Sequence, residues 1–249
     1  MYKFKNSLKL VELQCGRKTV MDKSGNVILE IIFPEFNKIR SRKIVSRSRA
    51  RPTGKYPSWK MGRMIQWESH NELNAFRLLD ANPNVTAFHE QPLTIHFQLN
   101  GERHLHYPDV LVHIGQSLEL WEIKPTAQAN EMEYVERTKF LSETLPALGF
   151  SYRMITGDGL AAQPRLSNIL TFLKFGRPQI PSSARELVRQ ILLSTNAIHW
   201  QSAVNGDLGI HGRRILSRLF LEGELLCDID KPLAWDTCFS SSETIHTRG

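Results

Sequence analysis

The stretch that most constrains the fold is a pair of β-branched and aromatic runs separated by a short polar break. The first run is residues 106–112 (HYPDVLV), the second is residues 118–125 (LELWEIKP), and Gly115 and Gln116 lie between them. Such residues favour strands, and a short break that contains glycine favours a turn between them. We therefore expect a β-hairpin around which the rest of the chain is organised.

This hairpin would gather charged side chains at one end. Side chains repeat with a period of two along a strand, so Glu122 and Lys124 project from the same face. If the strands pair across the turn, Asp109 lies near both of them. Two carboxylates and a lysine at this spacing can bind a hard divalent cation and hold a water beside it. An ordinary cross-strand ion pair is the alternative, because the pattern P-D…E-x-K also arises by accident.

Another carboxylate precedes the hairpin on an expected helix. Residues 68–80 have apolar side chains at helical spacing, and an Asn-Pro pair ends the pattern. Glu72 borders the apolar stripe, where it can face a neighbouring sheet, whereas Glu68 lies one turn earlier and is a weaker candidate. The alternative is a solvated glutamate at the helix edge.

The chain is basic, and part of that charge is concentrated. The formal net charge is +7 over 249 residues, which favours a polyanionic partner such as nucleic acid. Residues 38–63 contain Lys and Arg without any Asp or Glu, and Tyr56, Trp59 and Trp67 lie in or near this segment. We expect it to contact DNA phosphates, although a solvated basic loop is the alternative. The predicted DNA contacts are Arg40, Arg42, Lys43, Arg47, Arg49, Arg51, Lys55, Lys60 and Arg63.

The composition limits the classes of protein to which the chain can belong. Apolar residues make up 41% and charged residues 23%, as is typical of globular domains. No apolar run approaches the about 18 residues of a spanning helix, and the first five residues (MYKFK) lack a signal-peptide core. These features predict a cytoplasmic protein. The three cysteines Cys15, Cys227 and Cys238 are odd in number and widely spaced, which indicates neither a disulfide framework nor a zinc site.

The order of expected elements predicts two domains. Residues 1–176 alternate strands and helices in the pattern of an α/β domain, with a mixed β-sheet flanked by helices that include residues 129–141 and about 160–175. A Gly- and Pro-containing linker leads to residues 181–249, where three helices and a hairpin follow the pattern of a small winged-helix domain. Its first helix is expected to open with a capping box at residues 183–186 and to bury Leu187. The tail after residue 240 is polar and expected to be disordered.

The third helix of this second domain carries Arg213, Arg214 and Arg218. Arginines on such a helix suit contacts with a DNA backbone. They equally suit a protein partner or solubility, so the sequence leaves the binding role of this domain open.

In the order of its motifs and expected elements, the chain resembles TnsA-type endonucleases. These are the subunits of heteromeric transposases that cleave at the 5′ ends of a transposon. The resemblance rests on four motifs in family order: Ser69–Leu73 heading a helix, Glu90-Gln91-Pro92, Pro108–Val112 and Glu122–Pro125. It implies a restriction-endonuclease-like, PD-(D/E)xK catalytic domain joined to a C-terminal winged-helix domain.

The resemblance also implies roles for single residues. Glu72, Asp109 and Glu122 would hold Mg²⁺, for which Mn²⁺ can substitute, and Lys124 would be the catalytic lysine. Members of the family can carry glutamine where Glu122 stands, so this chain is nearer the general pattern of the wider nuclease superfamily. Gln91 matches a family glutamine and is expected at the edge of the site. Lys124 would position the attacking water and deprotonate it, which requires a lowered pKa.

The implied partners are double-stranded DNA, a TnsB-type transposase and a TnsC-type ATPase regulator. Two alternatives have different requirements. A stand-alone nuclease of the same fold, such as a phage junction resolvase or a restriction or repair enzyme, would cut naked DNA unaided. A non-catalytic adaptor would bind DNA through the winged helix alone, although the complete set of three acids and a lysine argues against a degenerate nuclease.

Overall fold

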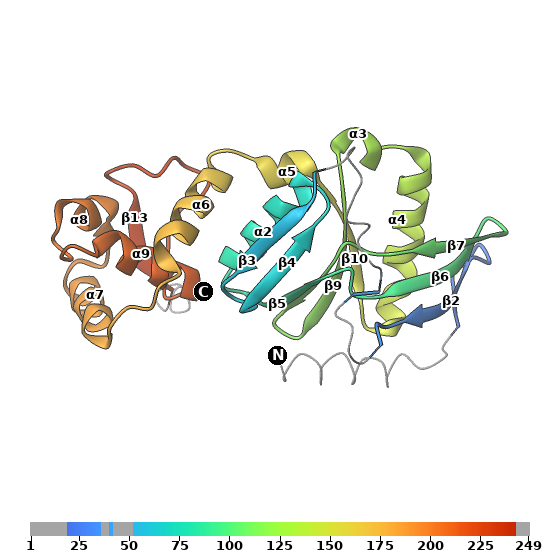
Figure 1. The fold of residues 1–249 in the computed structure, drawn as a ribbon, viewed down its shortest axis with the longest axis horizontal. Helices are drawn as coiled ribbons and strands as arrows, with labels where there is room; N and C mark the ends of the chain where they lie inside the picture. Colours follow the sequence, from blue (N-terminus) through green and yellow to red (C-terminus); the bar gives the residue numbers. More distant parts are fainter. Residues whose placement is uncertain (1–18, 36–39, 42–51, 243–249) are drawn as a thin grey trace. The chain divides into compact units, whose positions relative to one another are not determined.

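The computed structural model describes residues 19–35, 40–41 and 52–242 (Figure 1). By their contacts, these residues divide into two compact units. The first contains the described residues up to Phe76 together with Val85–Leu160, and the second contains Arg77–Asn84 together with the described residues from Ala161 onward. The helix expected near residues 160–175 was included in the first domain on sequence grounds, whereas its contacts are with the second unit.

A four-stranded mixed sheet forms the centre of the first unit. Its order is β10-β9-β8-β5, and the strands are β5 (Val85–Glu90), β8 (Val110–Ile114), β9 (Ser117–Lys124) and β10 (Ser151–Thr156). Strand β8 is antiparallel to both β5 and β9, and β10 runs parallel to β9. The expected hairpin is therefore confirmed as β8–β9, with Gly115 in the turn at φ 58°.

Two further antiparallel sheets belong to this unit. One has the order β1-β2-β6-β7, with β1 (Val20–Met21), β2 (Val27–Ile32), β6 (Thr94–Leu99) and β7 (Glu102–His106). Its β6–β7 turn places Asn100 and Gly101 at φ 52° and 85°, as a two-residue hairpin requires. The other sheet pairs β3 (Gly54–Ser58) with β4 (Arg63–Trp67), so the end of the basic segment is a hairpin.

The helices of this unit are α2 (His70–Ala81), α3 (Thr126–Ala129), α4 (Met132–Thr144), the 3-10 turn η1 (Leu145–Leu148) and α5 (Gly157–Ala161). The last residues of α2 group with the second unit. The helix expected at 68–80 is confirmed as α2, and the one expected at 129–141 is confirmed as α4, preceded by the short α3.

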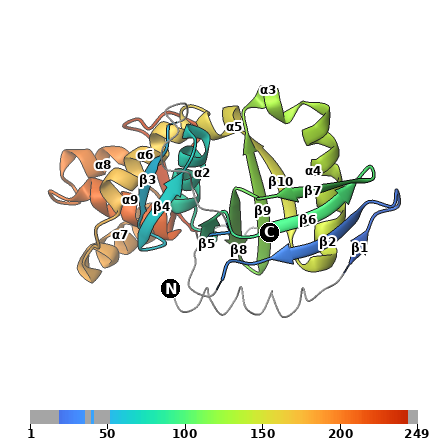
Figure 2. The same ribbon diagram turned by 45° about the vertical axis from the view of Figure 1, so that its right-hand side comes forward.

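The central sheet is covered on both faces. On one face, Leu111 and Leu120 share a buried cluster with residues of α4 and of the second sheet, where the rings of Phe97 and Phe140 lie 5.5 Å apart. Figure 2 shows α4 beside β10 and the β6–β7 hairpin. On the other face, Phe88 of β5 stacks on Phe76 of α2 with ring centres 5.9 Å apart. The mixed α/β architecture expected from the sequence is confirmed.

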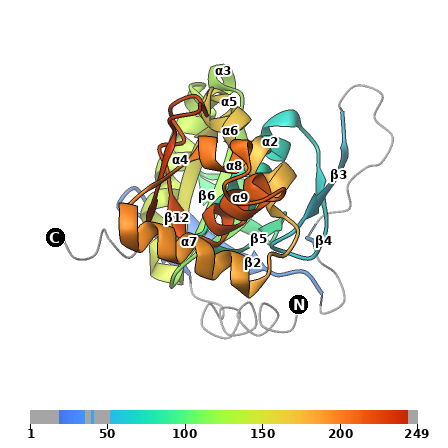
Figure 3. The ribbon, with the colours of Figure 1, turned by 90° about the vertical axis from the view of Figure 1, so that its left-hand side faces the viewer.

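The second unit is smaller and mainly helical (Figure 3). In chain order it contains α6 (Arg165–Gly176), α7 (Ser182–Thr195), β11 (Ile198–His199), α8 (Trp200–Asn205), α9 (Gly212–Glu222), β12 (Leu225–Leu226) and β13 (Cys238–Ser241). The three strands form an antiparallel sheet in the order β11-β13-β12. Phe172 of α6 is central to its core, 4.3 Å from the ring of Phe220 and 6.1 Å from that of Phe239.

Several local predictions for this unit were wrong. Helix α7 has Pro181 at its N-cap and no side-chain cap, because Glu186 instead accepts hydrogen bonds from Arg189 and Gln190. Leu187 is 43% exposed, and Ala184 and Val188 are buried in its place. Residues 240 and 241 belong to β13 rather than to a tail, and residues 243–249 lie outside the described part.

Within the described ranges, no helix combines the length and the apolar character needed to cross a bilayer.

Candidate active site

The end of the β8–β9 hairpin brings two carboxylates together. The last hydrogen-bonded register pair is Val110 with Trp121, and continuing that register by one step puts Asp109 opposite Glu122. The Asp109 N–H donates to the Trp121 carbonyl at 2.9 Å, and the Ile123 N–H donates to the Asp109 carboxylate at 2.7 Å. Asp109 is therefore fixed at the hairpin end through both its main chain and its side chain.

Lys124 stands beside Glu122, as the period of the strand predicts. Its Nζ lies 2.7 Å from Glu122 Oε1, and the Glu122 side chain is only 3% exposed. Two more side chains approach the same carboxylate: Arg137 Nη2 lies 3.4 Å from Oε1, and His106 Nε2 lies 3.4 Å from Oε2. Glu122 is thus a buried acid surrounded by the side-chain nitrogens of Lys124 on its own strand and of Arg137 and His106 on two other elements.

Burial and the charges of neighbouring side chains shift the pKa values of Asp109 and Lys124. Burial and the negative charge of Glu122 raise the pKa of Asp109 well above its usual range, although Lys124 opposes the shift. Burial lowers the pKa of Lys124, but the charges of Asp109 and Glu122 outweigh it, so the pKa is raised overall. Lys124 is therefore an ammonium group in the protein without a bound cation. The lowered pKa that a general base requires, which was expected to come from neighbouring cations, stays a prediction.

Glu72 lies in the first turn of α2, where it caps its own helix. Its N–H donates to Ser69 Oγ at 3.1 Å, while its carboxylate accepts hydrogen bonds from the Glu68 N–H at 2.8 Å and the Ser69 hydroxyl at 3.1 Å. This is a reciprocal cap of the capping-box type. Burial raises the pKa of Glu72, against an opposing influence from Lys124.

The first turn of α2 also lies near the hairpin end. A side chain at Gly157, which directly follows β10, would meet the amide of Asn71 at 2.5 Å, so α2 approaches the end of β10 closely. The charge of Glu72 acts on the pKa of Asp109, and that of Lys124 acts on the pKa of Glu72. The structure therefore brings the predicted residues Glu72, Asp109, Glu122 and Lys124 into one electrostatic neighbourhood.

A divalent cation fits part of this arrangement. Glu122 Oε2 is buried and accepts no hydrogen bond from the described residues, and the raised pKa of Asp109 reflects negative charge that a cation would offset. Carboxylate oxygens are also the donors that Mg²⁺ prefers. In the described residues, however, no three Asp, Glu, His or Cys side chains are close enough together to hold an ion. Because Glu72 caps its helix, it would have to turn before it could be the third ligand.

Gln91 lies closer to the acids than its expected place at the edge of the site. It has φ 45°, its N–H donates to the Asp109 carbonyl at 2.8 Å, and its Nε2 donates to Glu68 at 3.3 Å. Its Oε1 is buried and has no hydrogen-bond partner among the described residues. Gln91 therefore links the end of β5 to the Asp109 main chain and to the start of α2.

Sequence reasoning gave no role to Arg137, His106 or Tyr152, which complete the surroundings of Glu122. The Tyr152 hydroxyl lies 3.0 Å from His106 Nε2. Burial, together with the charges of Arg137 and Lys124, lowers the pKa of His106 to about 3, so its contact with Glu122 is not an ion pair at neutral pH. His106 begins the H-Y-P-D run that also contains Asp109, so the sequence did contain a signal that His106 lies near the acids. Arg137 is one of several charged residues on α4, and nothing in the sequence sets it apart.

The basic segment is only partly described. Arg42, Lys43, Arg47, Arg49 and Arg51 lie outside the described residues. Arg63 forms a bidentate pair with buried Glu90, at 2.9 and 2.6 Å. Arg40 lies 3.7 Å from the same carboxylate, and Lys60 donates to the Val85 carbonyl at 2.6 Å. Lys55 is exposed. Three of the predicted DNA contacts thus have intramolecular partners, and the DNA-binding role of the segment stays a prediction.

The arginines of α9 differ in accessibility. Arg213 is exposed and Arg214 is half-buried. Arg218 is buried, donates to the Arg177 carbonyl at 2.8 Å and pairs with Glu222 at 2.7 Å, so the suggestion that it contacts DNA was wrong. The reason is that α6 packs on α9, as the contact between Phe172 and Phe220 shows, and all of residues 215–221 are buried.

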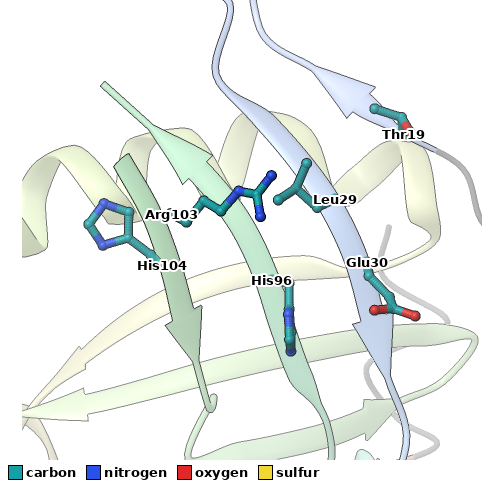
Figure 4. Close-up of a pocket in the computed structure, with 6 residues that line it drawn as sticks. All are labelled: Thr19, Leu29, Glu30, His96, Arg103 and His104. Carbon is teal, nitrogen blue, oxygen red and sulfur yellow. The ribbon is translucent and has the colours of Figure 1, made fainter. Parts of the chain in front are cut away.

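A pocket elsewhere in the first unit is shown in Figure 4. It lies on the second sheet, with side chains from β2, β6 and β7. Its lining residues are Thr19, Leu29, Glu30, His96, Arg103 and His104. None of the acids or the lysine at the β8–β9 hairpin end belongs to it, so this pocket is separate from the candidate active site.

Comparison with known proteins points to one family. The family model described as TnsA-like endonuclease N terminal matches residues 82–157, roughly a third of the chain. The matched region includes Asp109, Glu122 and Lys124, whereas Glu72 precedes it. A comparison with curated proteins finds no match. Residues 82–157 are therefore similar to the N-terminal part of TnsA-like endonucleases, and this similarity supports a nuclease of transposase type.

Proposed function

We propose that the chain is a metal-dependent DNA endonuclease of the TnsA type, which cleaves DNA at the 5′ ends of a transposon as one subunit of a heteromeric transposase. One observation carries the proposal. Asp109, Glu122 and Lys124 meet at the end of the β8–β9 hairpin, inside the region that is similar to TnsA-like endonucleases. Two acids and a lysine on adjacent strands are the residue types that phosphodiester hydrolysis requires.

Magnesium is the proposed cofactor, and manganese can replace it. Asp109 and Glu122 would hold the ion, and Glu72 would join them after leaving its cap. When bound, the ion supplies positive charge that stabilises the charge developing at the scissile phosphate and at the leaving 3′ oxygen.

Lys124 acts as an ammonium group in this proposal. Its raised pKa keeps it protonated at neutral pH, so it orients a water and stabilises negative charge rather than removing a proton. The hydrogen bonds that the Asp109 N–H donates to the Trp121 carbonyl and that the Asp109 carbonyl accepts from the Gln91 N–H hold Asp109 at the hairpin end, opposite Glu122.

The proposed partners are double-stranded DNA, a TnsB-type transposase and a TnsC-type ATPase regulator. From α7 onward, the second unit has the order helix, strand, helix, helix, strand, strand, which supports its assignment as a winged-helix module. Because residues 215–221 of α9 are buried, we infer that this module does not place α9 in a DNA groove.

Reconstituted cleavage tests the proposal. A transposon-end DNA substrate is incubated with the protein and Mg²⁺, with and without a TnsB-type transposase and a TnsC-type ATPase regulator. The proposal predicts 5′-end cleavage that requires both partners. Cleavage of naked DNA by the protein alone would instead identify a stand-alone nuclease. Absence of cleavage in every arm, with DNA binding retained, would identify an adaptor.

A further inference from the structure

Two cations contact one oxygen of Glu122. Lys124 Nζ lies 2.7 Å from Oε1, and Arg137 Nη2 of α4 lies 3.4 Å from the same atom. One carboxylate requires one counter-charge, and Lys124 supplies it at the shorter distance. Arg137 is therefore a second cation on a carboxylate oxygen that Lys124 already contacts at the shorter distance.

The other contacts of Arg137 are weak. Its Nη1 lies 3.6 Å from Glu133, whose side chain is 74% exposed, and it also interacts with the Tyr152 hydroxyl. Its Nε is buried and has no hydrogen-bond partner among the described residues. The guanidinium side chain is only 15% exposed. The Nε donor of this largely buried guanidinium is unused and its ion-pair distances are long, so its hydrogen-bonding capacity is incompletely satisfied.

The ring of Tyr134 lies within cation–π distance of both cations. Its ring centre lies 4.7 Å from Arg137 Cζ and 5.7 Å from Lys124 Nζ. An aromatic face at this distance favours a cation above it and limits the orientations of the guanidinium. Arg137 and Lys124 are thus presented side by side from α4 and β9, next to the acids at the hairpin end.

We propose that Arg137 contacts the DNA phosphate at the cleavage site, where it forms a two-cation clamp with Lys124. This inference rests on the proposed endonuclease function. A planar guanidinium with an unused donor matches the oxygens of a phosphate group. When Glu122 holds a divalent cation, its charge is occupied by that ion, and both basic side chains are free to bind the phosphate of the bound strand.

The test compares Arg137→Gln with Arg137→Lys and with a matched control. Arg153→Gln is the control, because Arg153 also pairs with a glutamate of β9, at 3.5 Å from Glu119, but its side chain is 58% exposed. Binding of a 30-bp double-stranded DNA is measured in Ca²⁺, which is expected to support binding without cleavage, at several salt concentrations. Single-turnover cleavage is then measured in the reconstituted Mg²⁺ reaction.

For Arg137→Gln we expect binding about tenfold weaker, and a slope of log Kd against log salt that is smaller by about one. We expect cleavage to fall at least 100-fold. Arg137→Lys should recover most of the binding and of the salt slope, and Arg153→Gln should behave as wild type. Unchanged binding and salt slope in Arg137→Gln would overturn the proposal and leave Arg137 as a structural brace for Glu122.

The binding measurement separates this proposal from the proposed function. If the wild type binds DNA through Arg137 but never cleaves it in the reconstituted reaction, the endonuclease assignment fails and the phosphate contact stands. If the wild type cleaves and Arg137→Gln both binds and cleaves normally, the contact fails and the endonuclease assignment stands.

Discussion

Asp109 lies opposite Glu122, one step beyond the last register pair of the β8–β9 hairpin. Two carboxylates facing each other at a buried strand end repel one another, and the raised pKa of Asp109 is the physical sign of that repulsion together with burial. Lys124 and Arg137 offset part of the charge through Glu122. This is the arrangement to which we propose that a cation and a DNA phosphate bind.

Cation affinity should rise with pH. A protonated Asp109 cannot bind a cation, and its pKa is raised, so protons compete with the metal to a higher pH than at an ordinary aspartate. We expect tighter Mn²⁺ binding at pH 8 than at pH 6 by isothermal titration calorimetry, and weak binding with a reduced pH dependence in Asp109→Asn. Equal wild-type affinities at both pH values would contradict this.

The two roles of Glu72 can be separated. Glu72→Gln keeps one oxygen to accept from the Glu68 N–H, and its amide can donate to Ser69 Oγ in place of the bond that the second carboxylate oxygen accepts. Because only the charge is lost, we expect an almost unchanged thermal midpoint and a large loss of cleavage. Ser69→Ala removes the other half of the cap and should lower the unfolding free energy by about 1 kcal/mol, with little effect on cleavage. Differential scanning calorimetry and the cleavage reaction check both variants. Full cleavage by Glu72→Gln would show that Glu72 serves only as a helix cap.

The basic segment should contain both structural and DNA-binding residues. Arg63→Gln leaves Glu90, whose side chain is 4% exposed, with Arg40 at 3.7 Å as its remaining basic partner among the described residues. Loss of one partner of a buried ion pair costs about 3 kcal/mol, which should appear as a lower urea midpoint. Lys55→Gln, on the exposed side of β3, should keep the midpoint and weaken DNA binding. The reverse pattern would show that Arg63 serves DNA and not the fold.

Acid should destabilise the first unit through His89. Burial, followed by the charges of Arg63 and His113, lowers the pKa of His89 from 6.5 to about 2. Between these two pH values the unfolded chain binds a proton on His89 that the folded chain excludes. The free energy of unfolding therefore has its full value above pH 6.5 and decreases as the pH falls. We expect His89→Gln to reduce the slope of unfolding free energy against pH by about 1.4 kcal/mol per pH unit near pH 5. An identical slope in the variant would show that His89 does not cause the loss of stability in acid.

The sequence predicted those parts of the site that follow from local periodicity. The hairpin, the shared face of Glu122 and Lys124, and the position of Asp109 all depend on a period of two and on a turn beside Gly115, which local sequence specifies. Helix α2 and the β6–β7 turn are specified in the same way, by apolar spacing and by Asn100-Gly101.

Other features depend on contacts between segments that are distant in the sequence, so local patterns could not predict them. The pairing of Arg137 with Glu122 joins α4 to β9, and the pairing of Arg63 with Glu90 joins β4 to β5. The burial of Arg218 results from the packing of α6 on α9, which a count of basic residues does not reveal. The capping box predicted on α7 failed because Glu186 has nearer partners on the same helix.

The most direct test of the central claim compares wild type with Asp109→Asn in the reconstituted Mg²⁺ reaction on a transposon end. Asparagine has nearly the same shape as aspartate and removes only the charge, and circular dichroism verifies the fold of the variant. We predict 5′-end cleavage by the wild type and its loss, by at least 1000-fold, in Asp109→Asn. Cleavage by Asp109→Asn at the wild-type rate would contradict the assignment of this hairpin end as the active site.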